Sequence, residues 1–100
     1  MKLQVTRHHF RDERDAIREI ADAGWRHVSW RDGPGDAYPP HTHDVDQRLY
    51  VVDGSLELDA EGQTVVLGPG DRLALPAFTV HAARARASGA TYLIATPDDD

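Results

Sequence analysis

Short β-type segments separated by glycine-containing turns occupy the chain after Gly24, and this pattern constrains the fold more than any other feature. Runs of about four to eight residues rich in β-branched and aromatic side chains are typical of strands. Gly beside Asp, Pro or Ser marks tight turns. The predicted strands cover residues 25–30, 48–52, 55–59, 64–67, 72–75, 79–86 and 91–96. Many short strands joined by such turns predict an all-β sandwich or closed barrel.

The N-terminal part predicts a short strand at residues 3–6 and one α-helix at residues 12–23. Asp12 is suited to be the N-cap, because its side chain can accept from a free N–H of the first turn. Ile17, Ile20 and Ala21 recur at helical spacing, and Gly24 is suited to end the helix. We expect one domain over residues 1–100, with the strand and helix in 1–24, the barrel in 25–97 and an acidic tail at 98–100.

The tetrapeptide Gly-Pro-Gly-Asp occurs twice, at residues 33–36 and 68–71. Two interpretations are open. The copies could form two similar turns that lead into two halves of a barrel, or a common turn sequence could occur twice.

Composition limits the available chemistry. The 100 residues include no cysteine and carry a formal net charge of −6. Disulfides and thiol chemistry are therefore excluded, and any metal must be bound by imidazole and oxygen. The negative charge disfavours nucleic acid as a partner. No apolar run is long enough for a membrane helix and no apolar leader is visible, so we expect a cytoplasmic protein.

Six histidines are present, and two of them, His41 and His43, lie two positions apart just before a predicted strand. Alternate residues of a strand face the same side, so both imidazoles are expected to project together. Gln47 has the same parity, and Leu49 and Val51 continue that face inward. The pair alone is more often surface polarity than a metal site. We expect the remaining histidines outside the site to be surface or structural residues: His8, His9 and His27.

Two stretches of the chain resemble the two motifs of the cupin superfamily. The first is Gly35-x5-His41-x-His43-x3-Gln47-x6-Gly54, where the family motif has Glu in place of Gln47. The second is Gly70-x5-Pro76-x-Phe78-x2-His81-x3-Ala85, where the family motif has Gly at Phe78 and Asn at Ala85. The resemblance covers about residues 28–96, with the short intermotif spacing of small bacterial cupins.

The resemblance implies a double-stranded β-helix, or jelly-roll β-barrel, that binds one divalent transition metal: Zn, Fe, Ni, Mn or Cu. His41, His43 and His81 match the three histidine ligands of the family. Gln47 stands at the glutamate ligand position, where its neutral carbonyl would bind more weakly and leave the ion a stronger Lewis acid. Gln47 could instead hydrogen-bond a ligand or the backbone.

Two classes of function follow from the resemblance. The metal could catalyse dioxygenase, decarboxylase or isomerase chemistry on a small organic molecule, or the domain could be a non-catalytic ligand-binding or sensor module. Small cupins also resemble one another in forming homodimers, and residues 1–6 could supply a strand to a partner.

Several side chains keep two interpretations. Phe78 could narrow the barrel mouth or pack against Leu75 or Val80. Arg72 and Arg84 could meet a carboxylate substrate or be exposed charges. The aromatic side chains could line a pocket, although most are expected to fill the core: Trp25, Trp30, Tyr38, Tyr50 and Tyr92.

Overall fold

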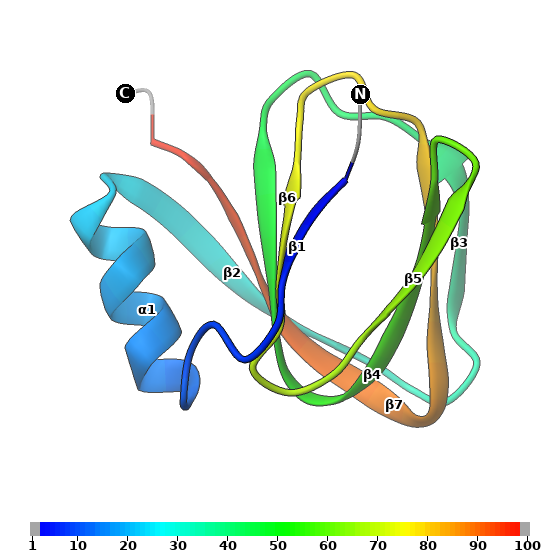
Figure 1. Ribbon diagram of the computed structural model, residues 1–100, viewed down its shortest axis with the longest axis horizontal. Helices are drawn as coiled ribbons and strands as arrows, with labels where there is room; N and C mark the ends of the chain where they lie inside the picture. Colours follow the sequence, from blue (N-terminus) through cyan, green and yellow to red (C-terminus); the bar gives the residue numbers. More distant parts are fainter. Residues whose placement is uncertain (1–2, 99–100) are drawn as a thin grey trace.

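The computed structural model describes residues 3–98, which form one helix and a single seven-stranded antiparallel sheet that curls around a core (Figure 1). The elements are β1 (Gln4–Thr6), α1 (Glu13–Asp22), β2 (Trp25–Asp32), β3 (Ala37–His41), β4 (Gln47–Ala60), β5 (Gln63–Leu67), β6 (Arg72–Leu75) and β7 (His81–Pro97). The predicted all-β jelly roll with one short N-terminal helix is confirmed. The beginning of the predicted N-terminal segment and the last two tail aspartates lie outside the described residues.

The sheet runs in the order β1-β6-β4-β7-β2, with β3 added to β7 and β5 added to β4. The two longest strands, β4 and β7, pair along most of their length, from Arg48 opposite Ala95 to Ala60 opposite His81. Both bend strongly, so that one sheet wraps around an apolar interior (Figure 1). The fully buried side chains of this interior include Val51, Leu56, Leu58, Leu67 and Leu73.

The predicted turns at Asp53-Gly54 and Ser88-Gly89 are wrong, because β4 and β7 continue through them. The β4–β7 register shifts on both sides of Gly54. A Cβ atom on Gly54 would lie 2.1 Å from the carbonyl oxygen of Gly89, and one on Gly89 would lie 2.6 Å from that of Asp32. These glycines let β2, β4 and β7 approach closely at a bend. We call this place the glycine crossing.

Helix α1 forms as predicted and covers the outer face of the sheet. The Asp12 carboxylate accepts from the Asp15 N–H at 2.9 Å, and Gly24, with φ +76°, follows the helix. Ala16 and Ile20 are its buried residues, whereas Ala21, which was predicted on the apolar stripe, is exposed. The helix packs into a second apolar cluster, which contains Phe10, Ala16, Ile20, Tyr50, Leu93 and Ala95.

The two Gly-Pro-Gly-Asp copies adopt the same turn. In each copy the Asp N–H donates to the carbonyl of the first Gly, at 3.1 Å for Asp36 and 3.0 Å for Asp71. In each, the Asp carboxylate accepts from the N–H of that same Gly, at 2.8 Å in the first copy and 2.9 Å in the second. Both interpretations of the repeat predict this shared turn, so the choice between them stays open. Between residues 3 and 98, no helix has the length and apolar character needed to cross a membrane.

Candidate metal centre

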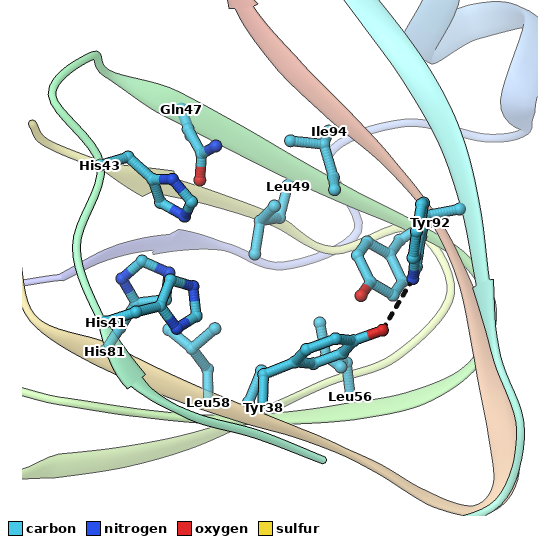
Figure 2. Close-up of a pocket in the computed structure, with 12 residues that line it drawn as sticks. Tyr38, His41, His43, Gln47, Leu49, Leu56, Leu58, His81, Tyr92 and Ile94 are labelled. Carbon is cyan, nitrogen blue, oxygen red and sulfur yellow. Dashed lines mark hydrogen bonds between the residues drawn. The ribbon is translucent and has the colours of Figure 1, made fainter. Parts of the chain in front are cut away.

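His41, His43 and His81 come together at one end of the barrel interior (Figure 2). Their ring centroids are 4.8 Å apart for His41 and His43, 4.3 Å for His41 and His81, and 5.2 Å for His43 and His81. One nitrogen from each ring lies within 4.8 Å of the other two. Small ring rotations would therefore let a single ion contact all three.

The histidines reach this position from two strands and a loop. His41 ends β3 and lies directly opposite His81, the first residue of β7, so the two form a cross-strand pair. His43 belongs to the loop between β3 and β4, and the prediction that His41 and His43 share a strand face was wrong. The Phe78 N–H donates to the His43 carbonyl at 2.7 Å. The Ala77 N–H donates to the Asp46 carboxylate at 2.8 Å, which holds the same loop.

Backbone carbonyls set the tautomers of two rings. Nδ1 of His41 is 2.7 Å from the Pro39 carbonyl oxygen, and Nδ1 of His81 is 2.9 Å from that of Thr79. A carbonyl can only accept, so each Nδ1 carries the proton and donates. Nε2 of each ring is then the atom with a free lone pair, as in histidines that bind metals.

The surroundings also favour neutral rings. Burial lowers the pKa of His81, and the neighbouring His41 and His43 rings lower it further, against the opposing effect of the Thr79 carbonyl. Burial and the adjacent His41 likewise lower the pKa of His43. Because only the neutral imidazole ligates a metal, these shifts extend metal-binding competence to lower pH.

Gln47 joins the same cavity. It begins β4, pairs with Leu75 of β6, and places its side-chain amide beside the His43 ring (Figure 2). The structure thus brings the four predicted site residues together around one space, and their role as ligands stays a prediction.

The space is a cavity of about 250 Å³ inside the curled sheet. The histidines occupy one end and Tyr38 and Tyr92 the other, with leucines between them (Figure 2). Trp30 lies at the tyrosine end, where its Nε1–H donates to the Tyr38 oxygen at 2.9 Å. Its lining residues are Trp30, Tyr38, His41, His43, Gln47, Leu49, Leu56, Leu58, His81, Ala83, Tyr92 and Ile94.

Asp32 organises the end of the cavity opposite the histidines, a role that was not predicted from the sequence. Its side chain is 2% exposed. It accepts from the Tyr38 hydroxyl at 2.5 Å, the Tyr92 hydroxyl at 2.7 Å and the Trp30 Nε1–H at 2.8 Å. The sequence places Asp32 in a turn, whereas its partners come from β2, β3 and β7. Trp30 and Tyr38 lie two and six positions from Asp32, but no local pattern connects Asp32 to Tyr92, 60 positions along the chain.

The other open interpretations are resolved by position. Trp30, Tyr38 and Tyr92 line the cavity, whereas Trp25 and Tyr50 pack into the cluster under α1.

The two arginines proposed for substrate binding lie away from the cavity. Arg72 donates to Glu19 at 3.1 Å, and Arg84 pairs with Glu57 at 3.4 Å.

Of the two histidines assigned to the surface, His8 is exposed, but His9 contacts Glu19 through Nε2 at 2.6 Å. His27, assigned a structural role on its strand, is exposed. Phe78 is 71% exposed and does not line the cavity, so neither interpretation of its ring holds.

Comparisons with known proteins agree with this geometry. Residues 28–97 match the Cupin_2 family, described as a cupin domain. Quercetin 2,3-dioxygenase of Bacillus subtilis (strain 168) is 43% identical over 53 residues, which are 52% of this chain and 16% of that protein. The chain therefore spans about a sixth of the length of this relative.

Solved structures share the fold. KdgF from Halomonas sp. superimposes with a TM-score of 0.68 and 32% identity, over 77% of this chain and 72% of that chain. The DMSP lyase DddQ from Ruegeria pomeroyi DSS-3 superimposes with a TM-score of 0.69 and 26% identity, over 76% of this chain and 39% of that chain.

Proposed function

Because this chain belongs to the Cupin_2 family of cupin domains, we propose that it binds one divalent transition-metal ion through His41, His43 and His81 and uses it to act on a small organic molecule. One observation carries the proposal. Three imidazoles from two distant parts of the chain converge within 4.8 Å at one end of a largely apolar cavity. In two of them Nδ1 donates to a backbone carbonyl, which leaves Nε2 free to bind an ion.

The donor set fits such an ion. Three imidazoles and the Gln47 amide face the cavity, and neither a carboxylate nor a thiol is among its lining residues. Imidazole donors suit Zn, Fe, Ni and Cu, whereas Mg, Ca and Mn prefer sites rich in oxygen. We therefore favour the first four ions.

The chain's own residues would position both the ion and its ligand. The carbonyls of Pro39 and Thr79 hold two imidazoles in the ligating tautomer. Leu49, Leu56 and Leu58 make the middle of the cavity apolar. A bound ion would supply a Lewis acid and, for iron, nickel or copper, a redox centre.

Oxygen-dependent chemistry is supported by the similarity to quercetin 2,3-dioxygenase, a much longer protein. A non-catalytic binding module is the second candidate. It is favoured by the lining of the cavity, which offers no carboxylate or lysine as an additional acid or base. Oxygen uptake with a panel of diketones and aromatic acids separates the two, with the His41→Ala/His43→Ala variant as the blank.

Metal content tests the site directly. Purified wild-type protein should contain close to one ion per chain by elemental analysis, and His41→Ala/His43→Ala should contain almost none. The matched control is His8→Ala/His27→Ala, which removes two exposed histidines outside the cavity. An unchanged metal content in the first double variant would refute the proposal.

A Gln47→Glu variant tests the fourth position. A carboxylate in place of the amide adds a charged donor, so the affinity should rise by roughly tenfold or more in a chelator competition. An unchanged affinity would mean that the side chain at position 47 does not contact the ion.

A further inference from the structure

The hydroxyl groups at the far end of the cavity have a fixed polarity. Tyr38 and Tyr92 both direct their hydroxyls to the buried Asp32, at the end of the cavity opposite the histidines. A phenol carries one O–H proton, and each donates its proton to a different oxygen of the Asp32 carboxylate. The only side-chain donor of Trp30 is also engaged, because its Nε1 lies 2.8 Å from the Asp32 carboxylate and 2.9 Å from the Tyr38 oxygen.

Trp30, Tyr38 and Tyr92 therefore have no free donor for a ligand, and only the phenol oxygens can still accept a hydrogen bond. The Tyr38 oxygen already accepts from Trp30, whereas the structure gives the Tyr92 oxygen no donor among residues 3–98. Within the same residues, Asp32 has no ion-pair partner, so its negative charge is balanced only by these three donors and makes the phenol oxygens better acceptors. The hydrogen bond to Asp32 raises the pKa of Tyr38, and burial together with Asp32 raises that of Tyr92. Both phenols thus keep their protons.

We propose that Tyr92, supported by Asp32 and Tyr38, selects ligands that present a hydroxyl group at the end opposite the histidines. This inference rests on the proposed function, because the histidine end, with its ion, holds the other end of the ligand. A hydroxyl can donate to the Tyr92 oxygen. A carboxylate or ether would instead place its lone pairs against those of the buried Tyr92 oxygen, which is unfavourable.

The rest of the cavity limits the ligand further. Its middle is lined by Leu49, Leu56, Leu58, Ala83 and Ile94, which suit an apolar ring or short chain. The volume of about 250 Å³ is below the range of roughly 300–1,000 Å³ of pockets for drug-sized ligands. The substrate class is thus a small, largely apolar hydroxy compound with an oxygen donor for the ion at its other end.

Three para-substituted benzoates test the selectivity on the zinc-loaded protein by isothermal titration calorimetry. In all three compounds the shared carboxylate is the donor for the zinc ion at the histidine end, and the para group points to Tyr38 and Tyr92. We expect 4-hydroxybenzoate to bind about tenfold tighter than 4-methoxybenzoate, as for one buried hydrogen bond. Terephthalate should be weakest. Equal affinity for the three, or no binding of any, would overturn the proposal.

Substitutions test whether Tyr92 causes the preference for a hydroxyl group. Tyr92→Phe should reduce the preference for the hydroxyl over the methoxy compound to within about twofold, with the metal content unchanged. Tyr50→Phe is the matched control, because Tyr50 is also a buried phenol bound to a carboxylate but lies outside the cavity. A preference that persists in Tyr92→Phe, or that is lost equally in Tyr50→Phe, contradicts the assignment. If Tyr92→Phe does not fold, the ranking of the three benzoates on the wild-type protein still decides.

A failed metal site can be told apart from a failed inference. Metal content is measured on every sample, and a protein without metal refutes the proposed function alone. In that case phenol and anisole are compared on the metal-free protein, by the NMR signal of the Trp30 indole N–H, assigned with Trp30→Phe. Phenol should shift this signal at lower concentration than anisole. An equal response would overturn the inference.

Discussion

At the scale of single residues, the histidines are prepared by their own backbone. His41 and His81 each donate from Nδ1 to the carbonyl two residues earlier in the chain. This local arrangement repeats on β3 and β7 and orients both rings whether or not an ion is bound. It also explains why a motif of fixed spacing can specify such a site, because the motif fixes the position of the histidine and, two residues earlier, of the carbonyl that orients its ring.

Phe78 shows the reverse case, in which the backbone conformation and the residue type disagree. It stands where the second cupin motif has Gly, and its φ is +65°, in the left-handed region that glycine favours. Its ring is 71% exposed and makes little packing that could offset this strain. Its N–H still holds the His43 loop, an interaction that any non-proline residue could make.

We therefore expect Phe78→Gly to stabilise the protein. Relief of the left-handed strain should raise the free energy of unfolding by about 0.5–1 kcal/mol, after allowing for the greater freedom of glycine in the unfolded chain. Chemical denaturation measures this. Phe78→Ala is the control, because it removes the ring but keeps the strain, and equal stability of the two variants would contradict the explanation.

At the scale of elements, helix α1 and most strands were predictable because their signals are local. Asp12 and Gly24 mark the ends of the helix, and the limits of β6 agree with those predicted. The division of β4 and β7 into shorter strands was wrong because Asp-Gly and Ser-Gly look alike in a turn and in a bend. A bend within a strand differs from a turn in having the backbone of another strand, distant in the sequence, packed against its glycine. The Asp32 network was missed for the same reason.

The glycine crossing predicts a large difference between two similar substitutions. Gly54→Ala should lower the free energy of unfolding by about 3–5 kcal/mol, because the new Cβ would clash with the Gly89 carbonyl in addition to the strain of a positive φ. Gly62→Ala should lower it by only about 1–2 kcal/mol, since φ is also positive there but no atom lies within 4 Å. Thermal unfolding of both variants provides the comparison, and similar losses would argue against the crossing.

Glu19 of α1 forms hydrogen bonds that hold the helix against the sheet. Its carboxylate accepts from His9 at 2.6 Å, from Tyr50 at 2.5 Å and from Arg72 at 3.1 Å. Burial raises the pKa of Glu19, but the hydrogen bonds from Tyr50 and His9 and the charges of His9 and Arg72 outweigh it, so the pKa lies below its usual value.

This shift predicts a pH dependence with a definite sign. The unfolded chain takes up the Glu19 proton at higher pH than the folded protein, so stability rises with pH across this interval. The contribution should be complete above the ordinary value of 4.5 and should be lost as the pH falls through the folded pKa. Glu19→Gln should be less stable at neutral pH and show a flatter acid profile. Glu13→Gln, an exposed acid on the same helix, should keep the wild-type profile.

At the scale of the whole molecule, residues 3–98 leave one long edge of the sheet, β2, without a neighbouring strand. β2 pairs with β7 on one side only, and Val28 and Trp30 on it are 58% and 46% exposed. The N-terminal segment that could supply a strand to a partner contains β1, which pairs with β6 and forms the other end of the sheet. Free edges with apolar side chains tend to be covered in stable proteins.

We predict a homodimer that is formed through β2. Sedimentation velocity should give twice the chain mass, and Val28→Lys should shift the protein to the monomer, because a lysine on an edge disfavours strand pairing. A wild-type protein that sediments as a monomer at all concentrations would rule this out.

The glycine crossing also determines where this chain could be opened by engineering. A protein designer who reads Asp53-Gly54 as a hairpin tip would choose it for a circular permutation or a fluorescent insertion. A break there would disturb the close approach that holds β2 against β7. It would also displace Asp32, whose carboxylate accepts from Tyr92 at the end of the cavity opposite the histidines. The Glu61-Gly62 tip between β4 and β5, with no atom crowding its glycine, is the place to cut.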